Sequence, residues 1–219
     1  ISWRLPRKPV DLVILQDASG SFKNTIPNVQ NALKTLTTFV KEEEYDENNP
    51  RLVKTDNPDT SDRVMMATFQ GADGYNYYYN NDFTGRKDVY GSWGPDYDYK
   101  YKASNLSSDQ NDIHQFINNI KVAGGTPTVP AIDDVIAQYN ERKGNMANGR
   151  KTIFLLITDG VANGKRDPDG KVRLEYSDYR NNILTRAWNF NELTEASQNV
   201  LGRVKEVKEA STRLKNVVG

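Results

Sequence analysis

Residues 10–21 read Val-Asp-Leu-Val-Ile-Leu-Gln-Asp-Ala-Ser-Gly-Ser, and this stretch decides the fold. Its first seven residues are almost continuously apolar, which is typical of a strand covered on both faces in a parallel sheet. Comparable apolar runs occupy 63–69 and 152–158. Because segments of helical periodicity separate these runs, we predict an α/β fold: an open, mostly parallel, Rossmann-like sheet flanked by helices.

Apolar residues recur at helical spacing between the predicted strands. The first helix should begin after Thr25, a possible N-cap, with Pro27 in its first turn. Its expected buried face consists of Ile26, Val29, Leu33, Leu36 and Val40. A short helix should follow a cap at Ser108 or Asp109, a third should run from Thr128 to Gly144, and a final helix should span about 191–215.

Three long polar stretches, at about 45–61, 71–108 and 161–189, are predicted to be loop insertions. Within the second, a turn at 71–74 followed by the tyrosine-rich 75–79 indicates a hairpin, so an antiparallel strand is expected at the sheet edge. We assign residues 1–9 to an N-terminal linker or domain start and residues 10–219 to one domain.

Composition removes several classes of function. Lys plus Arg number 29 and Asp plus Glu number 29, so the net charge is zero and nothing indicates nucleic-acid binding. No apolar stretch is long enough to span a membrane. There is no Cys, which excludes disulfides and thiolate metal sites but is compatible with export. With neither an initial Met nor a signal peptide, the chain is expected to be a mature fragment.

Enzymatic activity is not expected. His114 is the only histidine, so a Ser-His-Asp triad would have to use it, and neither Ser19 nor Ser21 lies in a Gly-x-Ser-x-Gly elbow. The loop after the first strand also lacks the lysine of a phosphate-binding loop.

Oxygen-bearing side chains gather in three short stretches that each lie where a strand ends or a helix begins. They are Asp17, Ser19, Ser21, Thr126 and Asp159. Both carboxylates follow buried strands, and the carboxyl ends of parallel strands meet at one edge of the sheet. Hydroxyl and carboxylate oxygens are hard ligands of the kind that Mg²⁺ prefers. An Asp-x-Ser-x-Ser sequence alone would equally suit a metal-free helix cap.

In this order, the motifs resemble the metal-ion-dependent adhesion site (MIDAS) of von Willebrand factor A (vWA) domains. The resemblance covers about residues 9–160 and implies a vWA fold that binds Mg²⁺, with Mn²⁺ or Ca²⁺ as alternatives. It also implies that Ser19 and Ser21 contact the ion directly, whereas Asp17, Thr126 and Asp159 contact it directly or through water. A partner's Asp or Glu carboxylate would then fill the open position.

The resemblance further implies a metal-dependent adhesion domain of a bacterial cell-surface or pilus protein. The expected location is extracellular, on a Gram-positive, especially streptococcal, surface and within a larger, cell wall-anchored multidomain protein. The expected partner is a host extracellular-matrix or cell-surface protein. Two alternatives remain: the docking part of a host-modifying surface factor that acts on lipoprotein or lipid, and an intracellular vWA subunit of a multi-subunit assembly.

The second insertion is rich in aromatic residues that could choose the partner, because tyrosine gives large contact area at low entropic cost. The candidate ligand-binding residues are Tyr90, Trp93, Tyr97, Tyr99 and Tyr101. The competing interpretation is an edge strand whose tyrosine rings pack on the domain itself.

Overall fold

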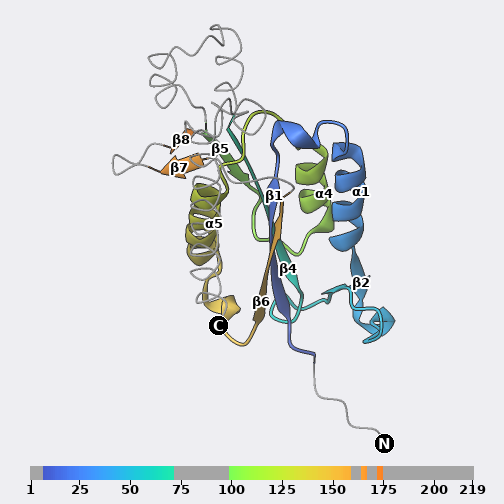
Figure 1. Ribbon diagram of the computed structural model, residues 1–219. Coiled ribbons are helices and arrows are strands. Elements are labelled where there is room, and N and C mark those ends of the chain that lie inside the picture. Colours follow the sequence, from blue (N-terminus) through green and yellow to red (C-terminus); the bar gives the residue numbers. More distant parts are fainter. Residues whose placement is uncertain (1–6, 72–98, 159–163, 167–171, 175–219) are drawn as a thin grey trace, which may run out of the picture.

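The computed structural model describes residues 7–71, 99–158, 164–166 and 172–174, and they build an α/β fold around a four-stranded mixed sheet (Figure 1). The strand order is β5-β4-β1-β6. Strands β1 (Val10–Asp17), β4 (Arg63–Gly71) and β6 (Lys151–Ile157) are parallel, and β5 (Tyr99–Ala103) is antiparallel to β4. The prediction of a mostly parallel sheet is therefore confirmed.

Helices cover both faces of this sheet. Helices α1 (Ile26–Leu36) and α4 (Gln110–Asn118) lie on one face, and α5 (Thr128–Arg142) lies on the other (Figure 1). Side chains of β1 alternate between the two layers: Leu12 and Ile14 pack with α1 and α4, whereas Val13 and Leu15 pack with α5. The continuous apolar run is thus explained by burial on both faces.

The first predicted helix is shorter than expected, and the first predicted loop contains a strand. Helix α1 ends at Leu36, which is 41% exposed. The hydroxyl of Thr37 donates a hydrogen bond to the carbonyl of Leu33, and that of Thr38 donates to the carbonyl of Lys34. These bonds satisfy carbonyls of the last turn and so stabilise the end of the helix. Val40, predicted on the helix, belongs to β2 (Phe39–Lys41). This strand pairs in parallel with β3 (Leu52–Lys54), which lies inside the predicted 45–61 loop.

The other two predicted insertions also contain strands. Residues 99–103 form the antiparallel edge strand β5, whereas residues 75–79, for which that role was predicted, lie outside the described residues. Strands β7 (Gly164–Arg166) and β8 (Val172–Leu174) pair within the predicted 161–189 loop. The predicted helix at 191–215 also lies outside the described residues.

The helix caps agree with the predictions in part, and the N-cap of α5 is Pro127. Asp109, not Ser108, caps α4 by accepting a hydrogen bond of 2.9 Å from the backbone of Asn111. Thr25 occupies the N-cap of α1 but makes no side-chain cap bond. Three short 3₁₀ helices complete the described elements: η1 (Gly20–Phe22), η2 (Glu42–Glu44) and η3 (Asn145–Ala147).

A buried ionic network closes the amino-terminal end of the parallel strands. Asp11, which is 0% exposed, accepts two hydrogen bonds from the guanidinium of Arg63, at 2.8 and 2.6 Å. It also accepts one from the hydroxyl of Tyr139 at 2.8 Å, and Arg150 lies 3.5 Å away. Arg150 donates to three backbone carbonyls of surrounding loops. The network therefore ties β1 to β4, α5 and these loops.

Candidate metal centre

The candidate site lies at the opposite, carboxyl-terminal edge of the sheet, shown at the upper end in Figure 1. Strands β1 and β6 pair in parallel with Gln16 opposite Ile157, so the residues that follow, Asp17 and Thr158, meet at this edge. The hydroxyl of Thr158 donates a hydrogen bond of 2.8 Å to Oδ2 of Asp17. Asp17 is fully buried, and its carbonyl accepts a further bond from the Gln16 side chain.

The loop after β1 folds back on the Asp17 carboxylate. The backbone N–H of Ser19 donates to Oδ1 of Asp17 at 2.8 Å, which fixes the turn into η1. The hydroxyl oxygens of Ser19 and Ser21 lie 2.9 Å apart. Ser19 is 2% exposed, whereas Ser21 faces solvent. Asp17, Ser19 and Ser21 therefore converge, as their alternating spacing predicts.

The glycine-rich loop at 123–126 is fastened directly to the loop after β1. The backbone N–H of Gly20 donates to the carbonyl of Gly124 at 3.0 Å, and Ala123 donates to Ala18 at 3.0 Å. Gly124 has a φ of 68°, a left-handed conformation that other residues rarely adopt. This fastening carries Thr126, which is 6% exposed, to the serine loop just before α5 begins.

The structure thus brings Asp17, Ser19 and Ser21 together and fastens the loop that carries a fourth predicted ligand, Thr126, to the loop after β1. The fifth, Asp159, lies outside the described residues, and its place in the site stays a prediction. Sequence reasoning missed the role of Thr158 as a hydrogen-bond donor to Asp17. The one feature of the sequence that could have indicated this role is the position of Thr158, a residue with a hydroxyl group, at the end of a strand that is parallel to β1.

The geometry of the serine pair fits a small divalent cation. An octahedral ion with Mg–O distances of about 2.0–2.1 Å places neighbouring ligand oxygens about 2.9 Å apart. The Ser19 and Ser21 oxygens have this spacing of 2.9 Å. Ca²⁺, with Ca–O distances of about 2.3–2.6 Å and often a pentagonal-bipyramidal set of ligands, also accommodates oxygens about 2.8–3.1 Å apart. The same spacing suits a hydroxyl–hydroxyl hydrogen bond, so the pair fits Mg²⁺ without requiring it.

The donor set is dominated by hydroxyls. Within the part of the chain that the structure describes, no group of three or more His, Cys, Asp or Glu side chains is placed to hold a metal. Asp17 is the described carboxylate of the site, and Ser19, Ser21 and Thr126 would supply neutral oxygens. Neutral ligands leave most of the charge of a bound cation uncompensated, which favours an anionic external ligand.

Two of the five candidate ligand-binding aromatic residues can be located. The hydroxyl of Tyr99 donates a bond of 2.6 Å to Asp134 on α5. Tyr101 packs against the core beneath α5, and burial, followed by the nearby Asp134 carboxylate, raises the pKa of its phenol. Tyr101 is thus half-buried against the domain itself, and its part in ligand binding stays a prediction. Tyr90, Trp93 and Tyr97 lie outside the described residues.

Comparisons with known proteins find a streptococcal relative. It is 57% identical over 222 residues to Platelet adherence protein A of Streptococcus gordonii, a match that covers 99% of this chain. The chain spans 6% of the length of that curated relative. No family model matches the chain.

Solved structures of pilus proteins are also similar. The pilus adhesin SpaC of Lactobacillus rhamnosus GG, in its open conformation, aligns with 77% of this chain and 18% of its own at 20% identity and a TM-score of 0.45. The vWF domain of the type V pili tip protein Mfa5 of Porphyromonas gingivalis aligns with 71% of this chain and 39% of its own, at 16% identity and a TM-score of 0.38. Among the described helices, none has the length and apolarity that crossing a bilayer demands.

Proposed function

We propose that this chain is a vWA-type adhesion domain of a bacterial surface protein and that it binds a host protein through a divalent cation at the candidate metal centre. The observation that carries the proposal is the convergence of Asp17, Ser19 and Ser21, with the Thr126 loop fastened beside them. The identity to a streptococcal platelet adherence protein supports a location on the cell surface, within a longer polypeptide.

Each described residue has a distinct part in this proposal. Ser19 and Ser21 would hold the cation, with Thr126 and Asp17 binding it directly or through water, and Asp159 completing the set. Thr158 and the backbone of Ser19 hold the Asp17 carboxylate in one orientation. The bound cation would supply a Lewis-acidic position for one carboxylate oxygen of the partner. The proposed role is binding and not catalysis.

Adhesion measurements with and without metal test this function. Wild-type protein should bind platelets or one of immobilised fibronectin, collagen and fibrinogen in Mg²⁺, and binding should disappear in EDTA. Ser19→Ala removes one candidate ligand and should lower binding at least tenfold in Mg²⁺, which corresponds to about 1.4 kcal/mol.

Ser108→Ala is the matched control, because Ser108 lies beside the start of β4 at the other end of the sheet and donates to the Asp62 carbonyl. It should bind like wild type. Adhesion that survives EDTA and Ser19→Ala unchanged would show that the metal centre is not the adhesive element.

A further inference from the structure

A surface without acidic residues flanks the candidate metal centre on the side of α1 and α4. From Ala18 to Lys41 and from Ile113 to Ile132 the sequence contains no Asp or Glu, although these two types account for 29 of the 219 residues. The first stretch comprises the serine loop and α1, and the second comprises most of α4 and the glycine-rich loop. The next carboxylates, Asp133 and Asp134, belong to α5 on the other face of the sheet (Figure 1). The two stretches therefore give this side of the centre no acidic side chain.

Three lysines stand on this surface. Lys23 follows the serine loop at the end of η1. Lys121 precedes the glycine-rich loop, and its carbonyl accepts a hydrogen bond of 3.3 Å from the side chain of Gln70 on β4. Lys102 belongs to β5, in which the neighbouring Tyr101 packs towards α5, so the alternation of the strand directs Lys102 to the side of α1 and α4. We refer to Lys23, Lys102 and Lys121 as the lysine rim.

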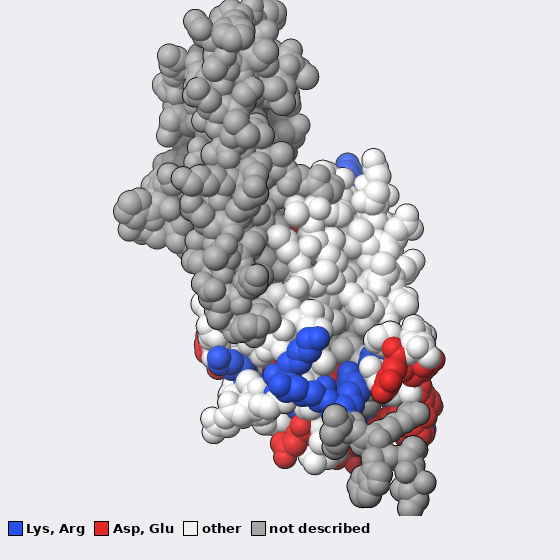
Figure 2. Space-filling model, turned by 60° about the horizontal axis from the view of Figure 1, so that its bottom comes forward, with Lys and Arg blue, Asp and Glu red and all other residues white. Residues whose placement is uncertain are grey.

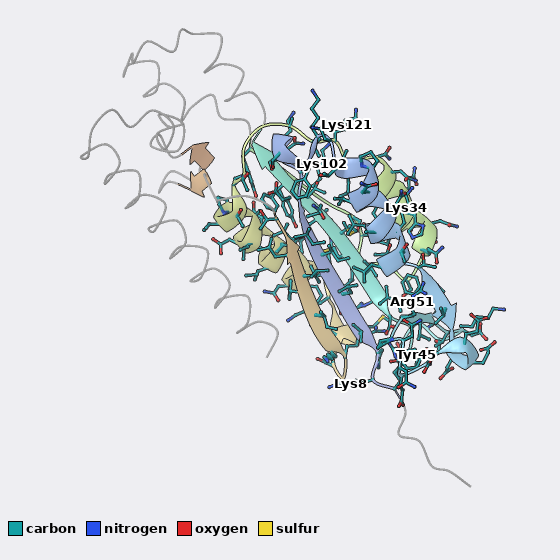
Figure 3. All side chains as sticks on the ribbon, turned by 45° about the vertical axis from the view of Figure 1, so that its right-hand side comes forward. Lys8, Lys34, Tyr45, Arg51, Lys102 and Lys121 are labelled. Atoms are coloured by element: carbon teal, nitrogen blue, oxygen red, sulfur yellow. The ribbon has the colours of Figure 1, made fainter. Side chains whose placement is uncertain are left out.

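The lysine rim is exposed and lies within reach of a ligand at the centre. Its three side chains face solvent, and the ion pairs between described residues do not include any of them. Lys102 lies opposite Thr68, which lies opposite Gln16 at the end of β1. Two strand spacings, or about 10 Å, therefore separate the backbones of Lys102 and Gln16. Figure 3 shows Lys102 and Lys121 together at the upper end of the molecule, where the centre lies.

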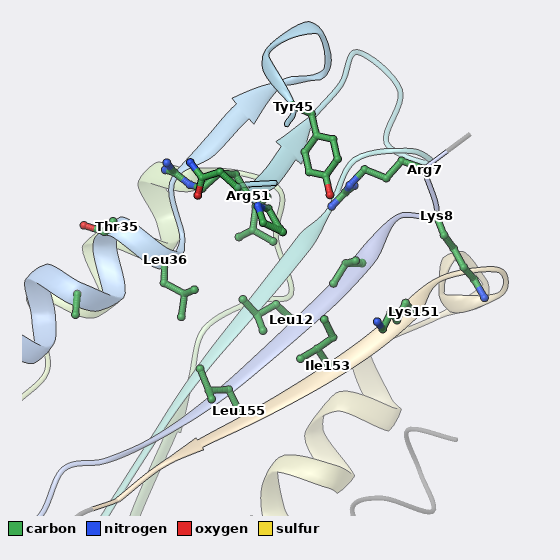
Figure 4. A pocket seen from close by; sticks show the side chains of 15 residues that line it. Arg7, Lys8, Leu12, Thr35, Leu36, Tyr45, Arg51, Lys151, Ile153 and Leu155 are labelled. Atoms are coloured by element: carbon green, nitrogen blue, oxygen red, sulfur yellow. The ribbon is translucent and has the colours of Figure 1, made fainter. Parts of the chain in front are cut away.

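Cations at the other end of the sheet stand in a different setting. Lys8 and Lys151 line a groove of about 980 Å³ over β1 and β6 (Figure 4). Figure 2, which brings this end forward, shows Asp and Glu side chains around the Lys and Arg side chains. Charges of both signs offset each other there, whereas the lysine rim would add its charge to that of a cation at the metal centre.

We propose that the lysine rim selects an acidic segment of the partner, in which the carboxylate that binds the cation is accompanied by further Asp or Glu side chains that contact Lys102 and Lys121. This inference rests on the proposed function, because it concerns the surroundings of the metal-bound carboxylate. A divalent cation beside lysines without acidic neighbours attracts anions and repels a basic segment. An extended peptide advances about 3.4 Å per residue, so the accompanying carboxylates should lie about three residues from the metal-bound one.

Chemical-shift titration of the ¹⁵N-labelled chain in saturating Mg²⁺ tests the proposal with two peptides. One is acetyl-Gly-Gly-Gly-Glu-Gly-Gly-Gly-amide, and the other has Asp in place of the first and last glycines. Both peptides should perturb the amides of Ser19 and Gly124 in Mg²⁺ and leave them unperturbed in EDTA. The Asp-containing peptide should bind wild type about fivefold more tightly, because it can form two further exposed ion pairs, and it should also perturb the Lys121 amide.

Charge reversal assigns this preference to the lysine rim. Lys102→Glu/Lys121→Glu should bind the Asp-containing peptide more weakly than the other peptide, because attraction becomes repulsion. It should also bind Mg²⁺ itself about threefold more tightly, since it removes two charges of the same sign as the ion. Lys8→Glu/Lys151→Glu makes the same change in net charge at the other end of the sheet and should keep the wild-type values of both. Circular dichroism of each variant establishes that the fold is retained.

The possible failures of the two proposals can be told apart. If neither peptide perturbs the amides of Ser19 and Gly124 in Mg²⁺, the proposed function is overturned and this inference falls with it. If wild type binds both peptides in Mg²⁺ with equal affinity, the metal-dependent binding stands and the lysine rim has no selective role. Equal loss of the preference in the two double variants would likewise overturn the role of the rim, because the preference would then follow net charge alone.

Discussion

Replacing Asp11 with asparagine should strongly destabilise the domain while leaving the metal centre intact. The change removes the buried carboxylate that Arg63 binds through two hydrogen bonds and that faces Arg150. Arg63 is 8% exposed and Arg150 is 7% exposed, so water cannot readily replace the lost partner. Breaking a buried ion pair from one side costs about 3–5 kcal/mol. In a chain of this length each kcal/mol lowers Tm by about 2–4 °C, so we expect a decrease of about 10 °C.

The assay is thermal unfolding of wild type, Asp11→Asn and the control Asp56→Asn, which alters an exposed loop carboxylate. Asp11→Asn/Arg63→Met, which removes both members of the main pair, should recover part of the loss. Asp11 and Asp17 are six residues apart on β1, or about 20 Å, so Mg²⁺ affinity of the folded variant should not change. A loss of less than about 1 kcal/mol would refute the reasoning, because it would mean that Arg63 and Arg150 are solvated without Asp11.

Three further outcomes are expected. Gly124→Ala should cost about 1 kcal/mol and weaken Mg²⁺ binding, because Gly124 has a φ of 68° and accepts from Gly20; unchanged thermal unfolding would contradict this. The pKa of Tyr139 is raised to about 12, above the value near 10 of an unfolded chain, mainly by burial and also by the Asp11 carboxylate. The hydrogen bond with Thr152 lowers this pKa and only partly offsets the increase. The free energy of unfolding that this pKa shift contributes should be fully present below about pH 10 and should decline as the pH rises to about 12. If the difference in free energy of unfolding between wild type and Tyr139→Phe stays constant across this pH range, the shift is excluded. Calorimetric titration should give tighter binding of Mg²⁺ than of Ca²⁺, because the five proposed side chains supply fewer oxygens than the six to eight that Ca²⁺ takes, and the reverse order would contradict an octahedral Mg²⁺ site.

The sequence predicts β1 and β4 well because their burial on both faces leaves a local mark. Both are largely apolar runs, and Leu12 and Val13 of β1 are buried against opposite layers. Strand β6 has a similar apolar run, although it is only partly buried. Strands β2 and β3 leave no such mark, because each has three residues and depends on pairing across a polar loop. The tertiary contact, and not the local pattern, makes Leu52 and Val53 part of a strand.

The candidate site divides in the same way. Asp17, Ser19 and Ser21 are close in sequence, so their spacing alone predicts that they converge. The contribution of Thr158 depends on the register of β1 and β6, which places Gln16 opposite Ile157 and is a long-range property. The fastening of the Thr126 loop likewise depends on the backbone bond between Gly20 and Gly124, which side-chain identity does not encode.

The central claim is that Ser19, Ser21 and their neighbours hold one divalent cation. Titration of Mn²⁺ followed by electron paramagnetic resonance, with Mg²⁺ as competitor, tests this claim most directly. Wild type should bind one Mn²⁺ that Mg²⁺ displaces, and Ser19→Ala/Ser21→Ala should lose that binding while Ser107→Ala/Ser108→Ala retains it. Equal Mn²⁺ binding by wild type and the Ser19→Ala/Ser21→Ala variant would contradict the account.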